Sequence, residues 1–322
     1  MTFITSTRAR TARAAILFTA LAAVSACGSS TTSTSSGNQP AATTSPTPTT
    51  VAAPTTVAAP TTAATRAAAA AAPKAIISLS PTATEILFAI GAGKQVIAVD
   101  DQSNFPADAP KTDLSGFTPN VEAIAARKPD LVVISDDGAK LVDALGKLGI
   151  KTLLQTPAKM LDDTYQQIGE LGTATGHSAE ATKVASDIKT SLADIVAKSP
   201  KVSMRIYHEV DDTLYSASSS SFIGQIYKLF GMENIADKAD KDATGFPQLS
   251  PEYLATANPQ VIFLADTKCC KQSAATLAAR PGWSDIDAVK KNKVIALDDD
   301  VASRWGPRVV DLARTIATSF GA

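Results

Sequence analysis

Residues 77–106 read ISLSPTATEILFAIGAGKQVIAVDDQSNFP. The apolar run at the start of this stretch predicts a short strand, and the segment 82–90 predicts a helix directly behind it. Ser80 and Pro81 stand at the junction, where a serine caps a helix and a proline suits its first turn. Another apolar run, Gln95–Val99, predicts a second strand. A strand, a helix and a strand in close succession indicate a parallel sheet covered by helices.

The alternation of apolar runs with amphipathic stretches continues to the end of the chain. Strands are expected at Ala75–Leu79, Gln95–Val99, Asp130–Ser135, Lys151–Gln155, Val202–Tyr207, Gln260–Ala265 and Lys293–Leu297. Helices are expected at residues 82–90, 119–127, 138–148, 160–174, 220–230, 250–257, 273–279 and 307–320. Because the pattern restarts after Pro200, the sequence predicts an α/β fold with two lobes, each built around a parallel sheet.

The segment between the two halves predicts one long helix at residues 178–199. Apolar residues recur along it at helical spacing, at Val184, Ile188, Leu192, Ile195 and Val196. At ~1.5 Å per residue the helix is about 30 Å long, enough to join two lobes as a stiff connector. The alternative is an ordinary crossover helix within one sheet. With this connector, the N-terminal lobe spans 74–177 and the C-terminal lobe spans 200–322.

The first 27 residues have the pattern of an export signal. Three arginines precede an apolar run, Ala14–Val24, that is too short to span a bilayer. The sequence Val24-Ser25-Ala26-Cys27 then resembles the lipobox of bacterial lipoproteins, which implies a diacylglycerol on Cys27 and cleavage before it. The alternative is an ordinary secretory signal with an incidental cysteine. The sequence therefore predicts a lipid-anchored protein at the outer face of the cytoplasmic membrane.

Residues 28–73 are rich in Thr, Ala, Pro and Ser, contain one charged residue, Arg66, and repeat VAAPTT at 51–56 and 57–62. Such a segment buries too little apolar surface to offset the entropy lost on ordering. It predicts a disordered tether between the anchor and the folded part.

The charge balance argues against a nucleic-acid-binding protein. The chain of 322 residues has 30 Lys and Arg against 31 Asp and Glu. Four of the basic residues precede Lys74 and all acidic residues follow it, so the folded part carries a net charge of −5. Three cysteines are too few for a disulfide scaffold, and two histidines leave little room for histidine-based catalysis. No G-x-S-x-G or P-loop motif occurs, so an exported enzyme is the weaker interpretation.

A short signature occurs once in each half. Glu122 is followed seven residues later by Pro129 and an apolar strand, and Glu252 is followed seven residues later by Pro259 and an apolar strand. The two glutamates are therefore expected at equivalent places in two related lobes. For each, the alternative role is a first-turn glutamate stabilised by its helix dipole.

Lys74–Ala322 resembles the substrate-binding proteins of ATP-driven importers for vitamin B12, ferric siderophores and haem. It looks like the class with two Rossmann-like lobes joined by one long helix, and residues 77–106 look most like the vitamin B12-binding members. PNVEAIAARKPDLVVI (119–134) and FPQLSPEYLATANPQVIFLAD (246–266) fit the two lobe signatures, and ASRWGPRVVDLARTI (302–316) fits the last helix.

The resemblance implies a non-enzymatic, monomeric receptor that needs no cofactor. Ligand binds between the lobes, and the loaded receptor docks on a permease that works with an ATPase. One glutamate per lobe meets arginines of the permease, a role that falls on Glu122 and Glu252. The cargo is cobalamin or another corrinoid, and the alternatives are a ferric siderophore or haem. A cell-envelope interaction or sensor protein without transport is the alternative from another class.

The resemblance also assigns residues to the cleft. The assigned ligand-binding residues are Ser80, Pro81, Phe117, Tyr215, Phe246, Asp300, Arg304, Trp305 and Arg308. Phe117 replaces a tryptophan of the vitamin B12 binders, while Gln102 and Ser135 stand at two further aromatic positions. Core packing is the alternative for the aromatic residues. Ion pairing is the alternative for the two arginines, with the aspartates Asp298, Asp299 or Asp311 as partners. Arginines in the cleft also suit anionic ferric siderophores or haem propionates.

Cys269 and Cys270 are adjacent in the sequence. In an oxidising compartment they are expected to form a vicinal disulfide, and the alternatives are a thiolate pair that ligates cobalt or iron and an inert pair. No metal site is expected at His177 or His208, because importer receptors for zinc or manganese need several converging ligands.

Overall fold

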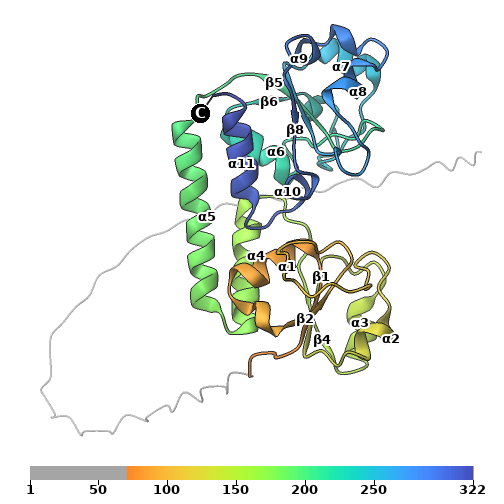
Figure 1. Ribbon diagram of the computed structural model, residues 1–322, viewed down its shortest axis with the longest axis vertical. Helices are drawn as coiled ribbons and strands as arrows, with labels where there is room; N and C mark the ends of the chain where they lie inside the picture. The colour runs from red at the N-terminus through yellow and green to blue at the C-terminus, as the bar shows by residue number, and fades with distance from the viewer. Residues whose placement is uncertain (1–70, 322) are drawn as a thin grey trace, which may run out of the picture. The chain divides into compact units, whose positions relative to one another are not determined.

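The structure is a computed structural model that describes residues 71–321 (Figure 1). The signal at 1–27, the lipidation site Cys27 and nearly all of the tether lie outside the described residues. Within 71–321, none of the helices combines the length and the apolar character needed to cross a membrane.

Two parallel sheets of four strands each form the centres of the two lobes. The N-terminal sheet contains β1 (Ile76–Leu79), β2 (Val96–Val99), β3 (Leu131–Ile134) and β4 (Lys151–Leu154) in the order β2-β1-β3-β4. The C-terminal sheet contains β5 (Arg205–Glu209), β6 (Glu233–Asn234), β7 (Val261–Leu264) and β8 (Val294–Ala296) in the order β6-β5-β7-β8. Both sheets thus have the same order relative to the chain, which confirms the predicted fold class.

Helices cover both sheets, and most lie where the sequence predicts them. The helices of the N-terminal lobe are α1 (Pro81–Ala89), α2 (Val121–Ala125), α3 (Leu141–Gly146) and α4 (Leu161–Thr175). Those of the C-terminal lobe are α6 (Phe222–Leu229), α7 (Pro251–Ala257), α8 (Ala274–Ala278), α9 (Asp287–Lys290), α10 (Asp299–Ser303) and α11 (Val309–Thr318). The sequence missed β6, α9 and α10, which have two, four and five residues and no apolar run or long amphipathic stretch to mark them.

The helix α1 begins as its sequence dictates. The Ser80 hydroxyl accepts a hydrogen bond from the Ala83 amide at 3.3 Å, and Pro81 occupies the first turn. The side chains of Ile86 and Leu87 are completely buried, and burial of each contributes roughly 1.5–3 kcal/mol. All four residues of β1 are buried as well, as expected for a parallel strand with helices on both faces.

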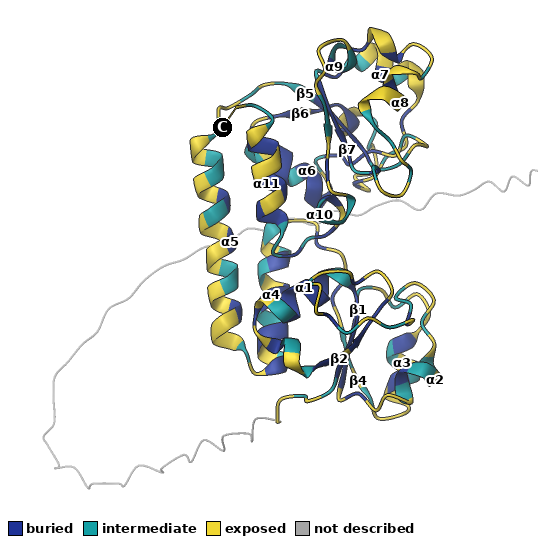
Figure 2. Ribbon diagram, in the orientation of Figure 1, coloured by how far each residue is buried: buried dark blue, intermediate teal, exposed yellow. Residues whose placement is uncertain are grey.

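The long helix α5 (Ser178–Lys198) joins the two sheets. It packs against α4 of the N-terminal lobe and α11 of the C-terminal lobe, which lie beside it in Figure 1. Its buried residues Ala181, Ile188 and Leu192 face these helices, while most of its other residues are at least partly exposed (Figure 2). The helix is therefore a connector between lobes and not a crossover within one sheet.

Candidate ligand-binding site

A cavity of about 490 Å³ is lined by residues of both lobes. The N-terminal lobe contributes residues 156–159, which follow β4, and the C-terminal lobe contributes Val210 after β5 and Ala265 after β7. The cavity therefore lies at the carboxyl ends of parallel strands, the usual position of ligand sites in such sheets. Its volume is within the range of roughly 300–1,000 Å³ that is typical of small-molecule sites.

The walls of the cavity are mostly apolar. Phe222 and Ile223 at the start of α6, together with Phe246 and Trp305, supply the large side chains. Serine and threonine hydroxyls add polar groups, and Lys159 is the one lining residue within 71–321 that carries a formal charge. Such a surface suits a ligand with a broad apolar face and uncharged polar edges.

Trp305 is held in place by the opposite lobe. Its indole Nε1 donates to Oε1 of Gln167 at 2.8 Å, and its carbonyl accepts from the Thr164 hydroxyl at 2.9 Å. Both partners belong to α4 of the N-terminal lobe. Phe246 is about half exposed, so Trp305 is a fixed aromatic wall of the cavity whereas Phe246 borders solvent.

His208 and Tyr227 form a buried polar pair beside the cavity. Nδ1 of His208 lies 2.8 Å from the Tyr227 hydroxyl, and His208 also lines the cavity. Burial lowers the pKa of His208 to about 4, so its imidazole is neutral near pH 7. In the described part of the chain, no group of three or more His, Cys, Asp or Glu side chains is placed to hold a metal ion.

Arg304 and Arg308 do not line this cavity, because they bind Glu85 of α1. Nη1 of Arg304 lies 2.8 Å from Oε1 of Glu85, and Nε of Arg308 lies 2.9 Å from Oε2. The Arg308 guanidinium also lies 4.5 Å from the ring centre of Phe105. Hydrogen bonding to Glu85 raises the pKa of Arg308. Both arginines thus form ion pairs with a carboxylate of the other lobe.

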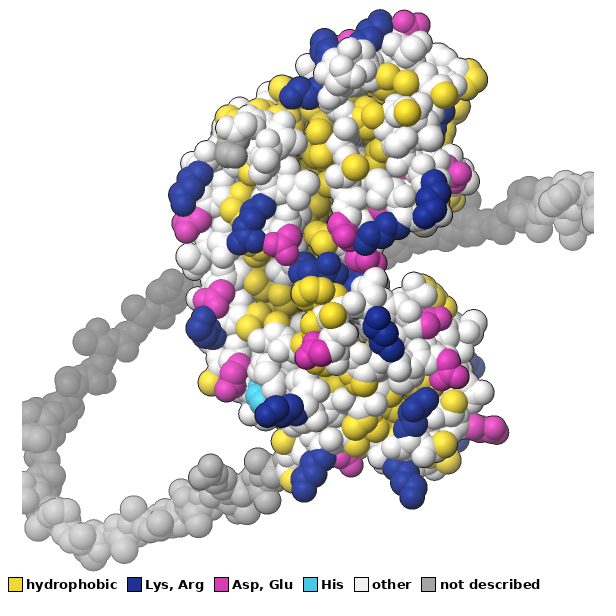
Figure 3. All heavy atoms as spheres, in the orientation of Figure 1, with side chains coloured by type: hydrophobic (Ala, Val, Ile, Leu, Met, Phe, Trp, Pro, Cys, Tyr) yellow, Lys and Arg dark blue, Asp and Glu magenta, His cyan; other side chains and the backbone are white. Residues whose placement is uncertain are grey.

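Arg304 makes further contacts across the junction of the lobes. It donates to the Asn104 side chain at 2.9 Å and to the Gln102 carbonyl at 3.0 Å, both in the N-terminal lobe. Within its own lobe it donates to Asp300 at 2.9 Å. Figure 3 shows basic and acidic side chains side by side where the lobes meet. Within residues 71–321, neither arginine forms an ion pair with Asp298, Asp299 or Asp311, so the alternative role names the wrong partners.

The remaining assigned residues lie elsewhere. Ser80 and Pro81 start α1 and do not line the cavity. Phe117 is 86% exposed before α2, and Tyr215 is 40% exposed in an isolated bridge with Gln248. Of the assigned set, Phe246 and Trp305 line the cavity, and Asp300, Arg304 and Arg308 meet at the lobe junction. The ligand roles of these residues stay predictions.

Several residues that line the cavity were not predicted from the sequence. The loop 156–159 and the pair Ser221-Phe222 had no assigned role, although each follows a predicted strand or opens a predicted helix. That position, at a strand end or a helix start, is the signal that would have found them. The cysteine pair is also outside the cavity: both thiols are free and the two Sγ atoms lie 2.6 Å apart.

Glu122 and Glu252 lie at equivalent places, which confirms the expectation from their spacing. Each is exposed in the first turn of a short helix. Glu122 lies in α2, which precedes β3, and Glu252 lies in α7, which precedes β7; β3 and β7 occupy the same position in their two sheets. The side chains of Asn120 and Ser250 cap the two helices. Hydrogen bonds from its own amide and from Ser250 lower the pKa of Glu252, so this carboxylate is ionised at neutral pH.

Two related parallel sheets, one connecting helix and an apolar cavity between the lobes define a bilobal binding protein. Residues 76–301 match the model of the periplasmic binding protein family, and the chain belongs to that family. It is 30% identical over 259 residues to the uncharacterised ABC transporter substrate-binding lipoprotein YvrC of Bacillus subtilis, covering 77% of this chain and 80% of YvrC.

Two further similarities concern vitamin B12. The chain is 30% identical to a vitamin B12-binding protein of Pectobacterium carotovorum over 79% of this chain and 91% of the relative. The crystal structure of the periplasmic vitamin B12 binding protein BtuF of Vibrio cholerae superposes with a TM-score of 0.62 at 25% identity, covering 77% of this chain and 96% of BtuF.

Proposed function

We propose that this protein is the extracytoplasmic substrate-binding component of an ABC importer and that its cargo is a corrinoid of the cobalamin type. The family, the substrate-binding lipoprotein relative and the vitamin B12-binding relative support this role. The protein captures its ligand between the lobes and delivers it to a membrane permease, without catalysing a reaction.

The observation that favours a corrinoid over haem or a ferric siderophore is that Arg304 and Arg308 are both paired with Glu85. Haem propionates and many ferric siderophores are anionic, and binding them in an apolar cavity requires free cations. Arg304 and Arg308 are paired with a buried carboxylate, which leaves Lys159 as the charged group of the lining. A corrin presents a large apolar face with amide groups at its edge, which matches aromatic walls and hydroxyl groups.

Calorimetry with cyanocobalamin, haem and a ferric siderophore tests the cargo. We expect cyanocobalamin to bind with a Kd of roughly 1 μM or tighter and the other two at least about tenfold more weakly. Phe246→Ala should raise the Kd for cyanocobalamin at least about tenfold, because it removes an aromatic wall. Leu148→Ala is the matched control, since it truncates an exposed apolar side chain away from the cavity. Preference for haem or the siderophore would contradict the corrinoid, and binding of none would contradict transport of all three.

The permease is the proposed partner of Glu122 and Glu252. Two carboxylates, one on each lobe, would fix the orientation of docking and speed association with a basic surface. The double change Glu122→Gln/Glu252→Gln should abolish corrinoid uptake and leave the Kd for cyanocobalamin unchanged. The double change Glu180→Gln/Glu233→Gln removes two other exposed glutamates and should leave uptake intact. A weakened ligand affinity in the first variant would instead place these glutamates at the ligand.

The lipid anchor at Cys27 completes the proposal. The lipobox-like sequence and the lipoprotein relative support attachment at the outer face of the cytoplasmic membrane. Cys27→Ser should release the protein from the membrane fraction while cyanocobalamin binding persists.

A further inference from the structure

The loop after β7 carries the two adjacent cysteines. Cys269 is exposed and Cys270 is half-buried, so small reagents can reach the pair. The two Sγ atoms lie 2.6 Å apart, and both thiols are free. The pair lies outside the ligand cavity, and neither the transport role nor the docking role uses it.

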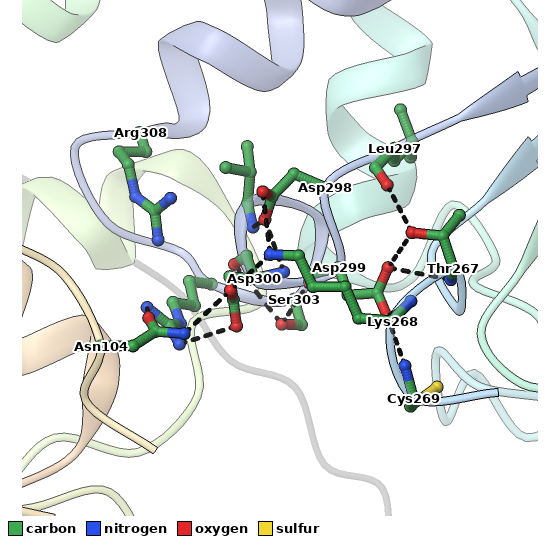
Figure 4. Close-up of polar contacts among 12 residues, drawn as sticks. Asn104, Thr267, Lys268, Cys269, Leu297, Asp298, Asp299, Asp300, Ser303 and Arg308 are labelled. Atoms are coloured by element: carbon green, nitrogen blue, oxygen red, sulfur yellow. Dashed lines mark hydrogen bonds and ion pairs between the residues drawn. The ribbon is translucent and has the colours of Figure 1, made fainter. Parts of the chain in front are cut away.

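One carboxylate holds the backbone of this loop. Asp299, in the first turn of α10, accepts from the amides of Thr267 at 2.9 Å, Lys268 at 2.7 Å and Cys269 at 3.1 Å (Figure 4). It also accepts from the Thr267 hydroxyl at 2.7 Å. The conformation of the cysteine loop and the position of α10 therefore depend on each other.

The same loop is connected to the contact between the lobes. Nζ of Lys268 lies 2.9 Å from Asp298 and 2.7 Å from Asp300. Asp300 in turn accepts from the side chain of Asn104, a residue of the N-terminal lobe, at 3.0 Å (Figure 4). It also accepts from Arg304 at 2.9 Å. A continuous set of polar contacts thus runs from the cysteines of one lobe to Asn104 of the other.

We propose that Cys269 and Cys270 form a reversible vicinal disulfide that loosens the contact of Asp300 with Asn104. An external disulfide is the oxidant. One cysteine thiolate attacks it and releases the first small thiol, and the second cysteine then displaces the second small thiol. The pair loses two electrons and two protons, and the external disulfide gains them.

Ring closure acts on the bonds to Asp299. Neighbouring Cα atoms lie about 3.8 Å apart, which is closer than the ~4.4–6.8 Å usual for disulfide-linked residues. The ring therefore imposes its own torsions on the backbone between the cysteines. Of the three hydrogen bonds that backbone amides donate to Asp299, the one from Cys269 is the longest and is the first to be lost. Burial and the hydrogen bond to Cys270 raise the pKa of the Cys269 thiol to about 12, so oxidation is slow at neutral pH.

The consequence for cargo release rests on the proposed function, but the lobe contact can be measured without cargo. The full chain carrying Cys27→Ser, which removes the third cysteine, is incubated with oxidised glutathione and then with dithiothreitol. Mass spectrometry of the peptide with both cysteines should show the loss of two hydrogens and their recovery on reduction.

Hydrogen exchange then reports on the junction. The amides of Asp101 and Ser103 bond to the carbonyls of Leu114 and Asp100, next to Asn104. Oxidation should speed their exchange at least about threefold, and dithiothreitol should reverse the change. The Cys270→Ser control should not respond, and Lys268→Met should exchange faster even when reduced. Absence of the intrachain disulfide, or its formation with unchanged exchange at these amides, would overturn the proposal. Failure of cyanocobalamin binding would affect neither measurement.

Discussion

Two buried glutamates, Glu85 and Glu209, are held by arginines in different parts of the molecule. The Glu85 side chain is 1% exposed and binds Arg304 and Arg308 across the junction of the lobes. The Glu209 side chain is completely buried inside the C-terminal lobe, where Arg280 approaches both of its oxygens at 2.6 and 2.7 Å. Both clusters place a carboxylate away from water, where an unpaired charge is costly.

The two clusters differ in how their charge is balanced. Around Glu85, two arginines face two carboxylates, because Asp300 also binds Arg304. Around Glu209, Arg280 faces Glu209 and the buried Asp266.

Protonation of Asp266 removes the excess of negative charge that Glu209 and Asp266 together have over Arg280. Its two carboxyl oxygens have no hydrogen-bond partner within 71–321 when both acids are ionised. Burial, followed by the charge of Glu209, raises the pKa of Asp266 to about 7. A proton on Asp266 gives it a donor toward Glu209. The comparison teaches that two arginines neutralise the buried Glu85, whereas one arginine and one proton neutralise the buried pair of Glu209 and Asp266.

The largest effect is expected at the lobe junction. Glu85→Gln keeps the shape of the side chain but leaves Arg304 and Arg308 without their buried partner. The free energy of unfolding should fall by roughly 3–5 kcal/mol, as for other buried ion pairs that lose one member. Thermal unfolding followed by circular dichroism measures the loss. Glu180→Gln, on the exposed surface of α5, is the control and should lose at most about 1 kcal/mol, because Glu180 only adds a negative charge to the first turn of its helix.

The sequence predicts the framework of the fold well, because period and caps are local. The strands β1, β3 and β7 are continuous apolar runs, and the residues that start α1 carry a cap and a proline. The short elements β6, α9 and α10 were not predicted, because their conformation depends on contacts with residues distant in the sequence. In α10, for example, Asp299 is positioned by the loop at 267–269.

The site is less accessible to sequence reasoning. Arg304 and Glu85 are 219 residues apart in the chain, and no spacing rule links them. Asp298 and Asp299, which are nearer in sequence, were the natural candidates and are wrong as partners of Arg304 among the described contacts. Phe246 and Trp305 were assigned through the resemblance, while Phe222, at the start of α6, had only its position at a helix start to indicate a role.

A smaller effect is expected from Asp266 and depends on pH. The unfolded carboxyl has a pKa near 3.8 and the folded one a pKa of about 7. Between these values the folded state binds more protons, so its stability falls as pH rises. Asp266→Asn mimics the protonated acid and should be more stable than the unmodified protein by roughly 2–4 kcal/mol at pH 8, since a full shift from 3.8 to about 7 corresponds to about 4 kcal/mol. The two proteins should be nearly equal at pH 4. Urea unfolding at both values measures the difference, and an equal difference at pH 4 and pH 8 would show that Asp266 does not hold the proton.

The smallest effect is expected from Glu209→Gln, although Glu209 is as deeply buried as Glu85. Its removal leaves one arginine and one acid, because Asp266 ionises and takes over the charge of Arg280. The free energy of unfolding at pH 7 should therefore fall by only about 1 kcal/mol, well below the loss for Glu85→Gln. The pH dependence should also become weaker. Burial still raises the pKa of Asp266, but without the charge of Glu209 this pKa falls below about 7, so the variant should lose less stability than the unmodified protein between pH 4 and 7. Urea unfolding of Glu85→Gln and Glu209→Gln across this range compares the clusters directly. Equal losses at pH 7 would mean that both glutamates are needed as charges, and that the spare acid in the C-terminal lobe has no compensating role.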